Sequence, residues 1–443
     1  MSPIEELRQR ETADIGRELH GFAAQLYPIC RSITGSGIRQ TLSMIADRIP
    51  LETNQIASGT PVFDWIVPRE WNIRDGYIKD PNGNRVVDFQ RLNLHVVNYS
   101  APIQAVMTLS ELKPHLFTLP DTPDWIPYRT SYYQEDWGFC LSHNQFLALD
   151  DVDYDVRVDA TLEDGFLTYG ECYLRGRSTD EVLISCHACH PSLANDNLSG
   201  LTVATALAQI LAKRDHYYSY RFLFIPGTIG AIAWLAQNRE NVSRIRHGLV
   251  LTCLGDAGGF HYKKSRRGDA EIDRAVAHVL RHHGEPSEIS EFSPYGYDER
   301  QYCSPGFNLP VGCLMRSVWG TFPEYHTSAD NLDFIRPEQL ARSLLVCASI
   351  VEVLENNCRY CNQNPYCEPQ MGRRNLYKST GGGAVGDEIP ARLWVLNLSD
   401  GEHSLLDIAE RSGLPFRAIF DAADLLAQNG LLAVVPDIPV PNR

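Results

Sequence analysis

Short apolar runs alternate with amphipathic stretches through the middle of the chain, from about residue 155 to 355. Amphipathic stretches with apolar residues at helical spacing lie between these runs, for example at 201–212 and 272–283. Such alternation is typical of a parallel sheet covered by helices. We therefore predict an α/β fold in which a mainly parallel, mixed sheet has helices on both faces. The runs expected to form its strands are 181–185, 221–225, 247–254 and 311–315.

The pattern changes on either side of this region. Residues 14–48 have a helical pattern, whereas between 60 and 148 Trp, Tyr and Val alternate with polar residues and turn signals such as 80–84. Near the C-terminus, three short helical patterns and a final apolar pair of strands are typical of a winged helix. We predict an α/β domain at 1–59 and 149–360, an inserted β domain at 60–148, a linker at 361–390 and a winged-helix domain at 391–443.

Charge limits the range of expected partners. The 443 residues carry a formal net charge of −15, which argues against a dedicated nucleic-acid binder. The segment 391–443 contains four arginines and no lysine against seven acidic residues, so a protein contact or a homo-oligomer interface fits it better than DNA. The N-terminus lacks the apolar core of a signal peptide, and no apolar run reaches membrane-spanning length. We therefore expect a cytoplasmic protein with neither nucleic acid nor membrane as partner.

Potential metal ligands follow the predicted strands. His190 and Asp196 lie in the loop after the first strand, Asp256 follows the third, and His326 follows the fourth. The carboxyl ends of parallel strands meet at one edge of a sheet, where ligands bind in open α/β folds. Two imidazoles and two carboxylates form a suitable environment for zinc. The pattern therefore predicts one or two Zn²⁺ ions bound by these four residues.

Longer motifs carry a resemblance to a known family. They are 26–35, 62–65, 70–75, 189–195, 298–306 and 323–328. Through them, nearly the whole chain resembles bacterial aminopeptidase-like proteins that have a C-terminal winged helix and are also described as polysaccharide-biosynthesis proteins. These are distant relatives of zinc aminopeptidases and glutaminyl cyclases. The resemblance implies that His190, Asp256 and His326 are zinc ligands and that Asp196 replaces the aspartate that bridges two metals. It favours His190 over His187.

One position departs from that family. Its members carry Pro-Glu-Thr-Ile-Gly after the second strand, where this chain has Gly227 in place of the glutamate. A glycine can neither bind a metal nor accept a proton, so the second metal and ordinary hydrolysis are both in question. The side chains that could replace this glutamate are Glu324 first, and then Glu299 or Asp298. Glu324 could equally orient His326, and Arg300 is a candidate for binding an anionic substrate group.

These observations leave three functions open. The first is a zinc-dependent hydrolase that cleaves an amide or peptide bond in a small-molecule or peptide-like substrate. The second is a diverged metal-dependent enzyme that performs a non-hydrolytic step, such as cyclisation or group transfer, in a biosynthetic pathway. The third is a non-catalytic binding protein. The loss of the glutamate at 227 favours the second more than the first, and the four expected ligands favour both over the third.

Overall fold

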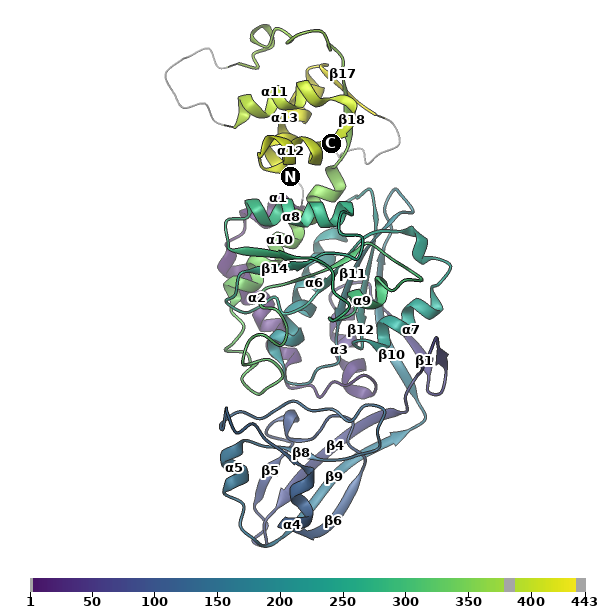
Figure 1. Ribbon diagram of the computed structural model, residues 1–443, viewed down its shortest axis with the longest axis vertical. Coiled ribbons are helices and arrows are strands. Elements are labelled where there is room, and N and C mark those ends of the chain that lie inside the picture. Colours follow the sequence, from purple (N-terminus) through teal and green to yellow (C-terminus); the bar gives the residue numbers. More distant parts are fainter. Residues whose placement is uncertain (1–2, 378–386, 436–443) are drawn as a thin grey trace.

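The computed structural model describes residues 3–377 and 387–435, and its largest element is an eight-stranded mixed sheet (Figure 1). The four central strands, β12, β11, β13 and β16, are parallel to one another, while β10 pairs antiparallel with β1 and β12, and β14 pairs antiparallel with β16. The predicted mixed α/β sheet is therefore confirmed. In spatial order the strands are β1 (Glu52–Ala57), β10 (Phe166–Leu174), β12 (Ser219–Ile225), β11 (Glu181–His187), β13 (Ile245–Leu251), β16 (Val311–Met315), β14 (Phe260–Lys263) and β15 (Ser287–Ser290).

Helices cover both faces of this sheet, because its central strands are apolar on both sides. In β12, Phe222 and Phe224 pack into one hydrophobic core, and Leu223 packs into the other. Strands buried on both faces read as continuous apolar runs, as the sequence does here. The first face carries α2 (Thr12–Leu26), α6 (Gly200–Leu211), α8 (Glu271–His282) and α10 (Pro337–Asn356), with α1 (Pro3–Gln9) against α10; the second carries α7 (Ile229–Gln237) and α9 (Glu299–Tyr302).

A smaller β domain is inserted between β1 and β10. Its four-stranded antiparallel sheet includes β9, which pairs with β4 and β6 and continues to Glu163. The predicted boundary at 148 therefore falls before the last strand of the insertion. The strands are β5 (Arg85–Asp88), β4 (Glu70–Lys79), β9 (Asp153–Glu163) and β6 (Ile103–Thr108), accompanied by β2 (Pro61–Val62), β3 (Trp65–Ile66), β7 (Leu116–Phe117), β8 (Phe139–Cys140), α4 (Leu109–Leu112) and α5 (His143–Leu147).

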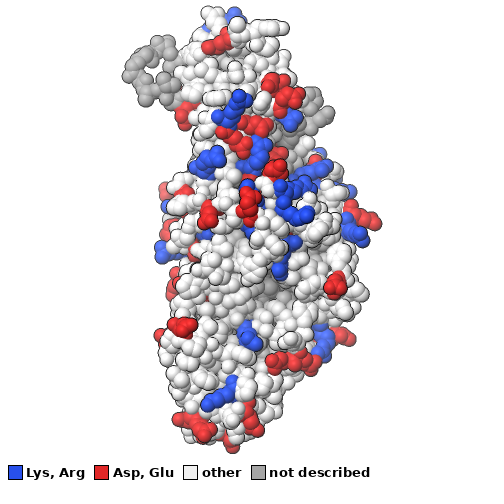
Figure 2. Space-filling view, viewed as in Figure 1, with Lys and Arg blue, Asp and Glu red and all other residues white. Residues whose placement is uncertain are grey.

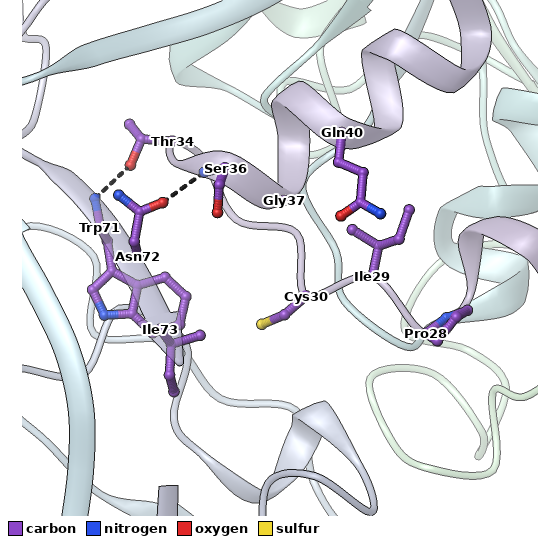
Figure 3. A pocket seen from close by; sticks show the side chains of 10 residues that line it. All are labelled: Pro28, Ile29, Cys30, Thr34, Ser36, Gly37, Gln40, Trp71, Asn72 and Ile73. Carbon is purple, nitrogen blue, oxygen red and sulfur yellow. Dashed lines mark hydrogen bonds between the residues drawn. The ribbon is translucent and has the colours of Figure 1, made fainter. Parts of the chain in front are cut away.

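Residues from two of the family motifs join the insertion to the α/β domain. The backbone N–H of Trp71 in β4 donates to the hydroxyl of Thr34, and the N–H of Ser36, at the start of α3 (Ser36–Ala46), donates to the side-chain carbonyl of Asn72. These residues border a pocket of about 340 Å³ (Figure 3). The motifs at 26–35 and 70–75 thus have a structural role at this junction.

In the part that the structure describes, the C-terminal unit contains three α-helices and a three-stranded sheet. Its central strand, β17, lies at the boundary of the α/β domain and extends into the segment predicted as a linker; residues 378–386 of that segment lie outside the described residues. The unit contains β17 (Arg359–Asn362), α11 (Glu388–Leu398), β18 (Asp400–Ser404), α12 (Leu405–Ser412), α13 (Phe416–Gln428) and β19 (Leu432–Val434).

Ion pairs join this unit to the α/β domain. Arg274 of α8 pairs with Asp407 and Glu410, and Arg417 of α13 pairs with Glu5 and Glu352. Figure 2 shows acidic and basic side chains interspersed where the two parts meet. Within the described ranges, each helix is too short or too polar to cross a membrane.

A buried histidine on α8 makes the stability of the fold sensitive to pH. Burial lowers the pKa of His278 from 6.5 to about 4, and the neighbouring His282 adds to the shift. Below pH 6.5 the His278 imidazole therefore binds a proton in the unfolded chain but stays neutral in the folded chain. Folding stability falls for this reason as the pH drops from 6.5 toward 4. Between pH 7 and pH 5 the free energy of unfolding should fall in both proteins. For His278→Leu we expect this fall to be about 1–2 kcal/mol smaller than for the unmodified chain. Urea unfolding at both pH values measures this difference, and equal losses would contradict it.

Candidate metal centre

The candidate centre lies at the carboxyl end of the central strand β11. His187 is the last residue of that strand, and His190 follows in the loop. The chain then forms an irregular turn at Ala194–Ser199, which carries Asp196, before α6 begins. This edge of the sheet is the one on which the sequence predicts the site.

Three histidines surround the carboxylate of Asp196. His187 Nε2 lies 2.7 Å from Asp196 Oδ1. His326 Nε2 lies 3.0 Å from Asp196 Oδ2, and His190 Nε2 lies 3.9 Å from the same oxygen. One ligand atom from each of His187, His190 and Asp196 falls within a group no wider than 4.8 Å. Imidazole nitrogens and a carboxylate at this separation are a donor set that suits zinc.

Burial and charge keep these groups in the protonation states that metal binding needs. Asp196 is fully buried, which opposes its ionisation, but His190 and His187 hold its pKa well below the usual value. Burial lowers the pKa of His190 to about 3 even though the charge of Asp196 acts in the opposite direction, so this imidazole is neutral at pH 7. An ionised carboxylate and a neutral imidazole both present free lone pairs to a cation.

Tyrosine side chains line the space around the ligand group. The hydroxyl of Tyr297 donates to Asp196 Oδ2 over 2.8 Å, and its ring stacks on His187 at a centroid distance of 4.6 Å. The ring of Tyr325 stacks on His326 at 3.9 Å. The Tyr297 and Tyr325 hydroxyls lie 2.9 Å apart, so a pair of phenols flanks the Asp196 carboxylate.

The inserted domain contributes a wall of the centre. The ring of Tyr128 lies 5.1 Å from the rings of both His190 and His326, and its backbone N–H donates to the His326 carbonyl. Ile126 and Ser328 exchange two further hydrogen bonds next to this contact. The insertion is thus held against the loop that carries His326.

A buried arginine and a buried aspartate hold the ligand loops in place. The Arg31 guanidinium donates from Nε and Nη2 to the backbone carbonyl of His190. The Asp330 carboxylate accepts the backbone N–H groups of Asn195 and Asp196. Both side chains are fully buried. They fix the backbone on either side of the turn that presents Asp196.

The structure brings His190, Asp196 and His326 together but places Asp256 differently. The Asp256 carboxylate accepts hydrogen bonds from the side chain of Asn195, the backbone of Gly258, and the backbone and hydroxyl of Ser317. It therefore stabilises the neighbouring loops and lies outside the compact ligand group, so a metal-binding role for Asp256 stays a prediction.

The predicted catalytic side chains are not gathered at the ligand group in the same way. Glu299 is fully buried, and its Oε1 lies 2.5 Å from Lys263 Nζ. Arg300 is half-buried, and its buried Nε has no hydrogen-bond partner among the residues that the structure describes. Glu324 is half-buried, two residues before His326, and its backbone carbonyl accepts from Thr327. Catalytic roles for these three stay predictions.

Sequence reasoning gave too little weight to His187. A histidine at the end of an apolar strand resembles a core residue. The pattern that could have identified His187 as a candidate ligand is its His-x-x-His spacing with His190. It also missed Tyr128, because no local pattern shows that the inserted domain reaches the centre.

The comparisons with known proteins place this geometry in a family. A family model described as "Domain of unknown function (DUF4910)" matches residues 20–357. The chain belongs to this family. A winged helix-turn-helix model matches residues 358–434, which confirms the predicted type of C-terminal domain.

A Clostridium acetobutylicum relative is similar over nearly the full length. It is named as a candidate polysaccharide biosynthesis protein with an aminopeptidase-like domain, and is 51% identical over 428 residues, which cover 96% of this chain and 98% of the relative. A crystal structure of a candidate peptidase from the same organism has a TM-score of 0.93 at 50% identity and covers 98% of this chain and 100% of that one. The expected resemblance to aminopeptidase-like proteins is thereby confirmed.

A more distant structure shows the fold alone. BSAP, a zinc aminopeptidase from Bacillus subtilis, has a TM-score of 0.55 at 12% identity, covering 77% of this chain and 95% of its own. The α/β domain therefore has an aminopeptidase-like fold.

Proposed function

We propose that this protein is a zinc-dependent hydrolase that cleaves an amide or peptide bond in a small-molecule or peptide-like substrate. The observation that carries the proposal is the convergence of His187, His190 and His326 on the buried carboxylate of Asp196. The aminopeptidase-like fold and the peptidase-like relatives support it.

The donor set fits a zinc ion. His187, His190, Asp196 and His326 would hold it, since together they offer imidazole nitrogens and carboxylate oxygens within a few ångströms of one another. Zn²⁺ bound in such a site acts as a Lewis acid on a carbonyl oxygen and lowers the pKa of a coordinated water.

The residues around the ligands would bind and orient the substrate. The Tyr128 ring lies beside His190 and His326, where it can contact an apolar part of a bound molecule. The Tyr297 hydroxyl donates to Asp196, so the Tyr325 hydroxyl is the one that can exchange its contact with Tyr297 for a hydrogen bond to a substrate oxygen. The inserted domain contacts the His326 loop through Tyr128 and Ile126, and a wall beside the ligands favours a small substrate.

Cleavage of a substrate panel tests this function. Purified protein is incubated with aminoacyl anilides, short peptides and N-acyl amino sugars, with and without prior treatment with a zinc chelator, and products are identified by mass spectrometry. We expect at least one substrate to gain the mass of one water on cleavage, with loss of the activity on chelation and recovery on addition of zinc. Turnover that the chelator leaves unchanged would contradict a zinc-dependent function.

A second function is favoured by Gly227. If the chain lacks the carboxylate that activates water, a metal-dependent cyclisation or group transfer on an amine becomes the alternative. The same panel distinguishes the two, because an intramolecular cyclisation that expels an amine or ammonia gives products without the added water.

Tyr128 provides a test of the contribution of the inserted domain. For Tyr128→Ala we expect KM to rise about 3- to 10-fold, the range that a lost aromatic contact of ~0.5–1.5 kcal/mol gives. For Tyr128→Phe, which keeps the ring and loses the hydroxyl pair with Tyr132, we expect KM within about twofold of the unmodified enzyme. Steady-state kinetics on the best substrate measures both variants. An unchanged KM for Tyr128→Ala would remove the inserted domain from substrate binding.

A further inference from the structure

The loop that lacks a carboxylate lies next to the metal centre. Gly227 follows β12, and β12 is paired in parallel with β11, the strand that ends at His187. A Cβ atom at position 227 would lie 3.6 Å from His187 Cβ and 3.5 Å from Cys189 Sγ, which is ordinary van der Waals contact. The site therefore has room for the start of a side chain at 227, directed against His187.

A carboxylate from another part of the chain contacts this same loop. Asp298 directly precedes α9, and its Oδ1 accepts the backbone N–H of Thr228 over 2.7 Å. Its other oxygen, Oδ2, is buried and has no hydrogen-bond partner among the described residues. An ionisable oxygen buried without a partner is costly, which indicates a role in binding or chemistry.

The residue before Asp298 places it beside the ligands. Tyr297 both stacks on His187 and donates to Asp196, so the segment 297–298 lies against the ligand group and the loop at 227 together. The Asp298 side chain is itself fully buried at this position.

The other carboxylates named from the sequence lack this arrangement. Glu299 forms a buried ion pair with Lys263. Glu324 is next to the His326 loop, and its backbone carbonyl bonds to Thr327 within that loop. Glu299 is as deeply buried as Asp298, and its Oε2 also has no hydrogen-bond partner among the described residues; the direct contact with the 226–228 loop is what distinguishes Asp298.

We infer that Asp298 supplies, from the start of α9, the catalytic carboxylate that Gly227 cannot provide. This inference rests on the proposed hydrolase function. As water attacks the substrate carbonyl carbon, a C–O bond forms and Asp298 Oδ2 accepts one proton of that water. As the C–N bond breaks, Asp298 returns this proton to the leaving amine nitrogen, so the carboxylate is restored and one water is consumed per bond cleaved.

An exchange of the carboxylate between the two positions tests the inference. The variants are Asp298→Asn, Gly227→Glu and the double variant, each assayed for kcat on the best substrate, bound zinc and melting temperature. Asparagine keeps an oxygen that can accept from Thr228, so the loop contact is retained. We expect Asp298→Asn to lower kcat by about 10²- to 10⁴-fold with bound zinc unchanged. We expect the double variant to have a kcat at least tenfold higher than that of Asp298→Asn alone.

Two matched controls complete the experiment. Asp273→Asn alters another buried aspartate, which bonds to Tyr262 and Ser265 away from the ligands, and should leave kcat within about twofold. Glu324→Gln should lower kcat much less than Asp298→Asn does.

Each other outcome would overturn the inference. A kcat for Asp298→Asn within threefold of the unmodified enzyme, or a larger loss for Glu324→Gln, would assign the proton transfer elsewhere. Loss of zinc in Asp298→Asn would show that Asp298 is a metal ligand instead. If a folded, zinc-loaded double variant shows no recovery of kcat, a carboxylate at position 227 cannot replace that of Asp298. If the unmodified enzyme itself shows no zinc-dependent cleavage, the proposed function fails, a result distinct from all of these.

Discussion

Replacement of Asp196 by asparagine is expected to weaken zinc binding by on the order of 100-fold or more. Asp196 is the group on which the three histidines converge, with His187 Nε2 at 2.7 Å and His326 Nε2 at 3.0 Å from its oxygens. Loss of an outer partner of a metal ligand already costs 10- to 100-fold in affinity, so loss of the central anionic ligand should cost at least that. Competition with a chromogenic chelator measures the zinc affinity of each variant.

The Asp273→Asn variant is the control for this experiment. Asp273 is as deeply buried as Asp196, but its carboxylate bonds to Tyr262 and Ser265 in a different part of the domain. Its substitution should lower the melting temperature without changing zinc affinity. Equal zinc affinities of Asp196→Asn and the unmodified chain would reject the ligand assignment.

The second large effect is expected at Asp330, which supports the centre without belonging to the ligand group. Asp330→Ala removes the acceptor of the Asn195 and Asp196 N–H groups, both of which lie in a fully buried turn. Leaving buried donors without a partner costs ~1–3 kcal/mol each. We therefore expect the free energy of unfolding to fall by about 2–4 kcal/mol and zinc affinity to fall at least tenfold, measured by urea unfolding and chelator competition.

The Asp330→Asn variant tests how much of this effect depends on having two acceptor oxygens. Asparagine keeps one side-chain oxygen as an acceptor, so this variant should lose less stability and less zinc affinity than Asp330→Ala. If both variants lose the same stability, or if Asp330→Ala loses stability with zinc affinity intact, the turn does not depend on Asp330 for presenting Asp196.

The sheet could be predicted from the sequence because its central strands are buried on both faces. Strands β11, β12, β13 and β16 read as continuous apolar runs, and each is followed by a helical pattern or a polar loop. The domain boundaries were harder to predict than the sheet, because β9 and β17 pair with strands far away in the sequence. Nothing local to those two strands reveals the sheet to which they belong.

The position of the candidate site at one edge of the sheet could also be predicted from the sequence, but the directions of its individual side chains could not. His190, Asp196 and His326 could be grouped because the carboxyl ends of parallel strands share an edge. Asp256 follows that rule too, but its carboxylate bonds to Asn195 and Ser317, and contacts between loops of this kind have no sequence pattern. For His187 the sequence pattern misleads in the other direction. Its place at the end of an apolar run predicts a core residue, whereas its side chain contacts Asp196.

The zinc content of the purified protein decides whether the His187, His190, Asp196 and His326 centre binds metal. The full-length chain is incubated with zinc, dialysed extensively, and analysed by elemental mass spectrometry together with the Asp196→Asn and Asp273→Asn variants. We expect at least one tightly bound zinc per chain in the unmodified protein and in Asp273→Asn, and a near-complete loss in Asp196→Asn. A folded, unmodified protein that retains no zinc would rule out a zinc site at this centre.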